Sequence, residues 1–172
     1  ATWNQLGGKI YGENANDYSG TSVSLSADGT VVAIGASSND GVTGQDSGQT
    51  RIYKLIEGSW IQIGSDIDGE EAGDASGASV ALSSNGETVA IGATHNKGGD
   101  ADGFQRGHVR IFQLSNGEWV QLGEDIDGIA DADKSGHYVL SLTADGTRVA
   151  IGSPWFDTGG IGSDQGQVRV FS

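Results

Sequence analysis

The sequence predicts an all-β fold built from three copies of one four-stranded antiparallel unit. Three observations predict this class: a block of residues recurs three times in the 172-residue chain, apolar side chains alternate with period two, and Asp-Gly or Asn-Gly pairs separate the apolar blocks. No segment has the spacing of an amphipathic helix. We therefore expect a single repeat domain over residues 1–172.

The repeat is marked by its tryptophans. Trp3, Trp60 and Trp119 each begin a segment of the form Trp-x-Gln-apolar-Gly, at spacings of 57 and then 59 residues. A Trp at the same strand position in every unit is expected to fill the space between neighbouring units. The units run over residues 3–59, 60–118 and 119–172, and three structural arginines coincide in the same register: Arg51, Arg110 and Arg169.

Within the first unit the strands follow in order. Residues 22–26 alternate polar and apolar side chains, as in a strand with one face in a core, and Asp28-Gly29 then predicts a two-residue hairpin turn at positive φ. Residues 31–36 are apolar on both faces, which places them inside the sheet. Residues 50–55 are rich in β-branched and aromatic side chains and lead through a second turn into the Trp strand.

Three such meanders fit best as blades of a β-propeller, which pack sheet on sheet around an axis. The alternatives are a three-sheet β-prism and a β-trefoil-like fold. The chain opens on a fourth strand at Trp3 and closes on a third strand at residues 167–171, and three blades are fewer than the ~4–8 that close a ring. We therefore expect a homodimer that forms a six-bladed ring, in which residues 3–7 of each chain complete the last blade of the other.

Charge and composition exclude several classes. The net charge of -14 disfavours nucleic acid and anionic lipid as partners and favours cations or basic partners. No apolar run approaches the ~20 residues of a membrane span, so no membrane insertion is expected. The absence of cysteine excludes disulfides and thiolate metal sites.

The acidic residues gather in two sets of loops. In an antiparallel meander, the loops after the second and fourth strands lie at the same end of the sheet. These loops hold 18 of the 23 acidic residues and 4 of the 9 basic ones, so this end carries the whole net charge. Long polar loops on a rigid scaffold are frequent recognition sites.

Residues around the first two strands resemble the FG-GAP repeat. Ser-Gly precedes the first strand in all three units, and the second strand ends in Gly-Ala-Ser at 35–37, Gly-Ala-Thr at 92–94 and Gly-Ser-Pro at 152–154. The resemblance covers essentially the whole chain and is closest to the bacterial and algal branch of the family that forms integrin α-subunit propellers. It implies an extracellular or cell-surface adhesion role. The integrin-type calcium loop is replaced here by a tight hairpin.

The acidic loops offer a different place for a cation. Asp-x-Asp-Gly occurs twice, and its carboxylates could supply oxygens to calcium, which is the cofactor we expect if the chain holds one. The alternative is that these are solvated turn residues, among which Asp74 and Asp133 accept backbone N–H groups and pair with the repeated arginines. The candidate ligands are Asp66, Asp68, Asp74, Asp125, Asp127, Asp131 and Asp133.

One aromatic pair breaks the repeat. Trp155 and Phe156 stand in a loop where the other units have Ser-Asn or His-Asn, and with Asp157 they form a candidate binding surface for a protein or glycan ligand. The three histidines, His95, His108 and His137, fall at non-equivalent positions and are expected to be ordinary surface residues. No catalytic group is selected, so we expect no enzyme.

Two classes of function follow. The first is a non-enzymatic extracellular binding or adhesion module that uses the acidic loop end as its contact or cation-binding surface. A carbohydrate-binding lectin is an alternative within this first class, and the second class is a structural self-assembly unit.

Overall fold

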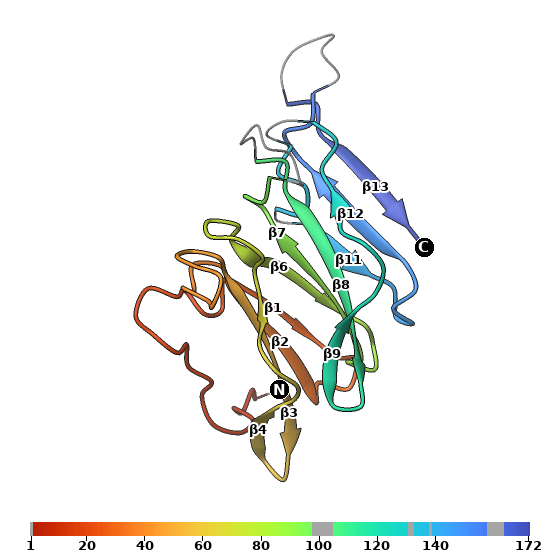
Figure 1. Ribbon diagram of the computed structural model, residues 1–172. Coiled ribbons are helices and arrows are strands. Elements are labelled where there is room, and N and C mark those ends of the chain that lie inside the picture. Colours follow the sequence, from red (N-terminus) through yellow and green to blue (C-terminus); the bar gives the residue numbers. More distant parts are fainter. Residues whose placement is uncertain (1, 98–104, 131–132, 138, 158–163) are drawn as a thin grey trace.

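The computed structural model describes residues 2–97, 105–130, 133–137, 139–157 and 164–172 (Figure 1). These residues form three antiparallel β-sheets that do not close into a barrel, and they contain no helix. The expected all-β class is therefore confirmed. A helix able to span a membrane is accordingly not found in this part of the chain.

Sheet 1 follows the expected meander, with the order β1-β2-β3-β4 and with β5 also beside β3. Trp60 of β4 lies opposite Leu55 near the end of β3, whereas Ile67 of β5 lies opposite Thr50 near its start. The fourth strand predicted from the Trp segment is thus split into two pieces that share one position. The strands are β1 (Ser22–Leu25), β2 (Val31–Ala36), β3 (Gln49–Ile56), β4 (Ser59–Gln62) and β5 (Ile67–Asp68).

Sheet 2 repeats this arrangement, and sheet 3 repeats its first three strands. Sheet 3 has the order β11-β12-β13, and no described residue pairs with the far edge of β13. The strands of sheet 2 are β6 (Ser76–Leu82), β7 (Thr88–Ala93), β8 (His108–Ser115), β9 (Glu118–Gln121) and β10 (Ile126–Asp127). Those of sheet 3 are β11 (Leu140–Leu142), β12 (Val149–Ser153) and β13 (Gln167–Phe171).

The segment before β1 has no strand of its own. Residues 3–7, expected to be a strand that is supplied to a second chain, are irregular in the single chain. This segment lies beside sheet 1, and β13 lies in sheet 3 on the other side of sheet 2 (Figure 1). The two therefore do not pair within one chain.

The hairpins close through two kinds of turn. Between β3 and β4, Glu57 and Gly58 both have positive φ, 49° and 80°, which is the geometry of a two-residue hairpin. The prediction of the same geometry for Asp28-Gly29 is wrong, because of these two residues only Gly29 has a positive φ, 70°. The Asp28 carboxylate instead accepts a hydrogen bond from the backbone N–H of Thr30, so the side chain stabilises the turn.

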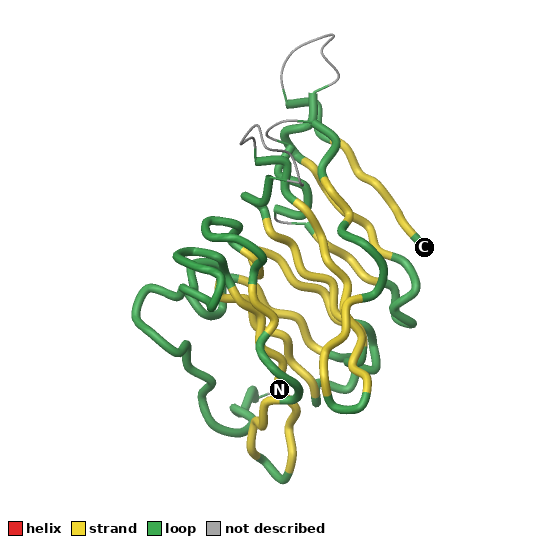
Figure 2. Tube along the Cα trace, viewed as in Figure 1, coloured by secondary structure: helices red, strands yellow, loops and turns green. Residues whose placement is uncertain are grey.

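The sheets stack face to face in chain order, and the core lies between them (Figure 2). One cluster of buried apolar side chains includes Ile52 of sheet 1 and Ile91 of sheet 2, and a second includes Val109 of sheet 2 and Ile151 of sheet 3. Every residue of β7 is buried, whereas β13 alternates half-buried and exposed positions. Sheet 2 is therefore covered on both faces, and the outer faces of sheets 1 and 3 are not.

Candidate functional site

The repeated tryptophans hold successive repeats together. The indole N–H of Trp119 donates to the carbonyl oxygen of Ile63 at 2.9 Å, and the ring lies against Gly64, where an added Cβ would come within 2.6 Å of Cδ1. Trp60 makes the equivalent hydrogen bond to Leu6 at 3.0 Å. Each tryptophan therefore packs on the Trp-x-Gln-apolar-Gly segment of the repeat before it.

The third contact of this series is unfilled. The equivalent acceptor is Leu122, and a Cβ added to the next residue, Gly123, would meet no atom within 4 Å. Trp3, the remaining repeated tryptophan, is 97 % exposed. A cavity of about 290 Å³ lies at the position where a tryptophan would pack, between Leu122 and Gly123 of sheet 2 and Val149 and Phe171 of sheet 3.

The repeated arginines also link successive repeats. Each guanidinium donates through Nη2 to a backbone carbonyl at the end of the fourth-strand position of the preceding repeat. The pairs are Arg51 with Tyr11 at 2.8 Å, Arg110 with Asp68 at 2.6 Å and Arg169 with Asp127 at 2.6 Å. Tyr11 thus takes the place of Asp68 and Asp127, so the N-terminal segment lies where a preceding sheet would present its fourth strand.

The outer faces of the stack are apolar and exposed. On sheet 1, Val23 and Leu25 are 64 % and 59 % exposed, whereas the equivalent Val80 and Leu82 of sheet 2 are 9 % and 8 % exposed. On sheet 3, Val168 is 70 % exposed. These side chains occupy positions that are buried wherever a neighbouring sheet is present.

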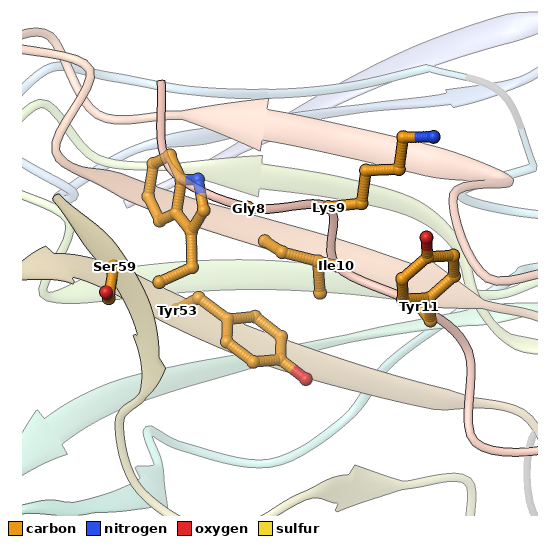
Figure 3. Close-up of a pocket in the computed structure, with 7 residues that line it drawn as sticks. Gly8, Lys9, Ile10, Tyr11, Tyr53 and Ser59 are labelled. Atoms are coloured by element: carbon orange, nitrogen blue, oxygen red, sulfur yellow. The ribbon is translucent and has the colours of Figure 1, made fainter. Parts of the chain in front are cut away.

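A shallow cavity of about 350 Å³ lies between the N-terminal segment and sheet 1 (Figure 3). Ile10 lies over the ring of Tyr53 there, and Lys9 and Tyr11 point outward. Ile10 is half-buried, whereas Ile67, its equivalent against sheet 2, is buried. We interpret this cavity as a loosely packed seam, because a segment without its own sheet covers the position less completely.

A larger cavity, about 500 Å³, opens at the loop end of the stack. Small side chains of loops from sheets 1 and 2 line it together with His95 and His137. Beside it the rings of His137 and Trp155 stack with centroids 4.8 Å apart, and the Lys134 ammonium lies 5.3 Å from the Trp155 ring. Burial, Lys134 and His95 lower the pKa of His137 to about 4, so this ring is neutral at pH 7.

The three residues of the predicted binding surface, Trp155, Phe156 and Asp157, differ in their exposure. Trp155 and Phe156 are half-buried, and Trp155 packs beside the loop-end cavity, whereas Asp157 is exposed. The chemistry available at this end is a neutral imidazole, an indole face and small polar groups.

The predicted calcium ligands lie in several places. Asp66 and Asp68 come together at Gln49, whose Nε2 donates to both at 3.2 and 3.3 Å. Asp74 and Asp133 are buried and accept backbone N–H groups of their own loops, as expected of turn residues. Asp127 offers its backbone carbonyl to an arginine, Asp125 joins a cluster described next, and Asp131 lies outside the described residues.

Glu70, His108 and Asp125 bring three ligand atoms together, all within 4.8 Å of one another. His108 begins β8, Asp125 immediately precedes β10, which pairs with β8, and Glu70 comes from the loop after β5. Burial lowers the pKa of His108 to about 4. Burial also raises the pKa of Glu70; the nearby Asp125 charge adds to this shift and Arg110 opposes it.

The expectation that His108 is a surface residue is wrong, because its side chain is 1 % exposed. It stands in the register of Gln49, at the first residue of a third strand. That alignment was visible in the sequence, but the approach of Glu70 from another sheet was not.

Comparisons with known proteins leave the family open. No family model matches the chain, and no curated protein matches it. Among solved structures, one similar chain comes from Bacteroides uniformis and carries a provisional assignment as a 6-phosphogluconolactonase, with 16% identity and a TM-score of 0.48. The alignment covers 85% of this chain and 40% of that one, so the chain spans less than half the length of this neighbour.

Proposed function

We propose that the chain is a non-enzymatic assembly and binding module, made of three blades of a β-propeller that a second copy completes to six. The observation that carries the proposal is the unfilled tryptophan position at Leu122 and Gly123, together with the exposed Trp3 of the same chain. Two repeats already make this contact, so a Trp3 from a second copy needs no new kind of interaction.

The strand register supports the same arrangement. In sheet 2, Gln113 pairs with Val120, and by the repeat these residues correspond to Ser172 and Asn4. The N-terminal segment of the second copy would therefore lie along β13 as the missing fourth strand. It would satisfy backbone groups that an unpaired edge leaves open.

The apolar flanks supply a driving force. Val23 and Leu25 on one outer face and Val168 on the other would be covered in the ring. Their equivalents are covered in the same way, Val80 and Leu82 between sheets 1 and 2 and Val109 between sheets 2 and 3. Covering one such side chain contributes about 1.5–3 kcal/mol at full burial. Since each copy presents both flanks, two-fold symmetry lets both seams of the ring close at once.

Binding is the second candidate, and the loop-end cavity favours it. The loops after the second and fourth strands place His95 and His137 around one opening at the acidic end, with the Trp155 ring beside it against His137. An indole face beside small polar groups suits a sugar ring or a protein side chain. The FG-GAP resemblance supports an extracellular or cell-surface location for such a module.

Sedimentation equilibrium at micromolar concentration tests the assembly. We expect twice the chain mass of 17.6 kDa for the unmodified protein and the single-chain mass for Trp3→Ala. Trp155→Ala, which changes an aromatic side chain away from the seam, should keep the doubled mass. A single-chain mass for the folded unmodified protein would overturn the proposal, as would a doubled mass for Trp3→Ala.

A further inference from the structure

We propose that Glu70, His108 and Asp125 form a binding site for a divalent transition-metal ion of the zinc type. This site goes beyond the proposed function. It would tie the loop after sheet 1 to sheet 2, because Glu70 comes from the former and the other two ligands from the latter.

The distances from His108 to the two carboxylates fit ligands of one ion, and all three ligand atoms lie within 4.8 Å of one another. His108 Nδ1 lies 3.6 Å from Asp125 Oδ2 and 3.8 Å from Glu70 Oε2. Both are too long for a hydrogen bond. Two ligands at about 2.0–2.2 Å from a tetrahedral ion are themselves roughly 3.4 Å apart, which is close to the observed spacing.

Each of the two carboxylates has one oxygen held by a neighbouring side chain, and its other oxygen is available to an ion. Gln121 Nε2 donates to Asp125 Oδ1 at 2.8 Å, and Arg110 Nη1 lies 3.5 Å from Glu70 Oε1. The remaining oxygens, Oδ2 and Oε2, are the ones that face His108. Such outer partners orient ligands in known metal sites.

The imidazole is buried and faces the cluster through Nδ1. The side chain of His108 is 1 % exposed, and Nδ1 is the nitrogen that lies within 4 Å of both carboxylates, whereas the other ring nitrogen, Nε2, has no hydrogen-bond partner among the described residues. The side chains of Glu70 and Asp125 are 40% and 28% exposed, so an ion can enter from solvent and keep a water ligand. An imidazole nitrogen with two carboxylates suits zinc, nickel or cobalt better than calcium, which prefers oxygen ligands alone.

Repeat one shows what the position requires. Gln49, Asp66 and Glu13 occupy the places of His108, Asp125 and Glu70, and the Gln49 amide donates to the two carboxylates at 3.2 and 3.3 Å. An amide donor thus holds the acidic side chains together in one repeat. In the next repeat the imidazole of His108 replaces this amide and makes no such hydrogen bond. The ion would then hold the two carboxylates together.

Calorimetric titration of the full chain with zinc chloride tests the site. We expect one ion per chain, with affinity at least tenfold weaker in His108→Gln, which introduces the residue that repeat one carries. Asp125→Asn should weaken binding similarly without changing the buried ring. The matched control His95→Gln should bind as the unmodified protein does, and a hundredfold excess of calcium should not displace zinc.

Cobalt provides the spectroscopic reading. Binding through His108 should give visible absorption bands of a four-coordinate cobalt ion, and these bands should be absent in His108→Gln. Melting curves establish that each variant is folded. The proposal is overturned if the unmodified protein takes up no zinc, or if the folded variants His108→Gln and Asp125→Asn both bind zinc with unchanged affinity.

Discussion

Trp119 and Gly64 form one contact from two successive repeats. The glycine has a φ of 70°, and its missing side chain makes room for the indole, which donates to the carbonyl of Ile63 just before it. The same pairing occurs between Trp60 and Gly7. A glycine in one repeat therefore makes room for the tryptophan of the next repeat. The proposed dimer would use the same contact between two chains.

Alanine at Gly64 and at Gly123 should have different effects on stability. Both glycines have positive φ, 70° and 72°, so either substitution costs about 1 kcal/mol in backbone strain. At Gly64 the new Cβ also presses on Trp119, and overpacking of this kind costs about 1–3 kcal/mol more. Urea unfolding of the dilute protein measures the difference, and equal losses would show that the indole contact contributes nothing.

Gly123→Ala should act on association instead. In the proposed six-bladed assembly this position receives Trp3 of the second copy. A Cβ there would obstruct the indole of Trp3, as a Cβ at Gly64 would obstruct the indole of Trp119. We expect sedimentation to show a weaker dimer for Gly123→Ala. An unchanged dissociation constant would place the second copy elsewhere.

Lysine at Val168 should separate the copies without unfolding them. Val168 is 70 % exposed, yet its equivalent Val109 is fully buried by sheet 3. A charge at the proposed seam should therefore raise the dissociation constant at least a hundredfold. Val120→Lys is the control, because Val120 and its equivalent Ile61 are 52% and 50% exposed and neither faces a seam.

Glu57→Asn should stabilise the turn between β3 and β4. Glu57 has a φ of 49°, and the equivalent turn of sheet 2 carries Asn116 at 53°. Asparagine tolerates this region better than other non-glycine residues, so a gain of about 0.5–1 kcal/mol is expected. Glu57→Ala removes the same charge and should give no gain; a similar gain in both variants would assign the effect to charge.

Acid should weaken the fold through the histidines. The pKa of His137 in the folded chain is about 4, below its ordinary value near 6.5. As the pH falls from about 6.5 to 4, the unfolded chain takes up a proton that the folded chain does not, so stability is lost in this window. The variant His137→Ala, which introduces the residue found at position 78, should lose less stability between pH 7 and 4.5 in chemical unfolding; an identical loss would contradict the assignment.

The sequence was sufficient for the features that depend on local pattern. Period-two alternation gave the strands, and the threefold register placed Trp60 and Trp119 at equivalent positions of two sheets. The turn at Asp28 differs from the prediction because the Asp28 side chain adds a hydrogen bond from the Thr30 N–H to the backbone hydrogen bonds of the turn. Such competition between side chain and backbone is not visible in a dipeptide motif.

The candidate site shows a second limit. The acidic motif points to Asp125, but its neighbours Glu70 and His108 are 55 and 17 residues away in sequence. His108 comes close through the pairing of β8 with β10, and Glu70 comes close only through the stacking of sheet 1 on sheet 2. Periodicity assigns faces within a strand and says nothing of which loop of one sheet reaches the next. The burial of His108 therefore cannot be predicted from periodicity alone.

Disulfide trapping tests the assembly most directly, because the sequence contains no cysteine of its own. In the proposed register Asn4 of one copy lies opposite Ser172 of the other, and cross-strand pairs at roughly 4.5–5.5 Å between Cα atoms can be bridged. The double variant Asn4→Cys with Ser172→Cys should oxidise to a closed dimer of twice the chain mass. The one-residue shift, Gln5→Cys with Ser172→Cys, places the two side chains on opposite faces and should stay uncrosslinked. Monomers alone, a ladder of longer polymers, or equal crosslinking of the shifted pair would contradict the six-bladed ring.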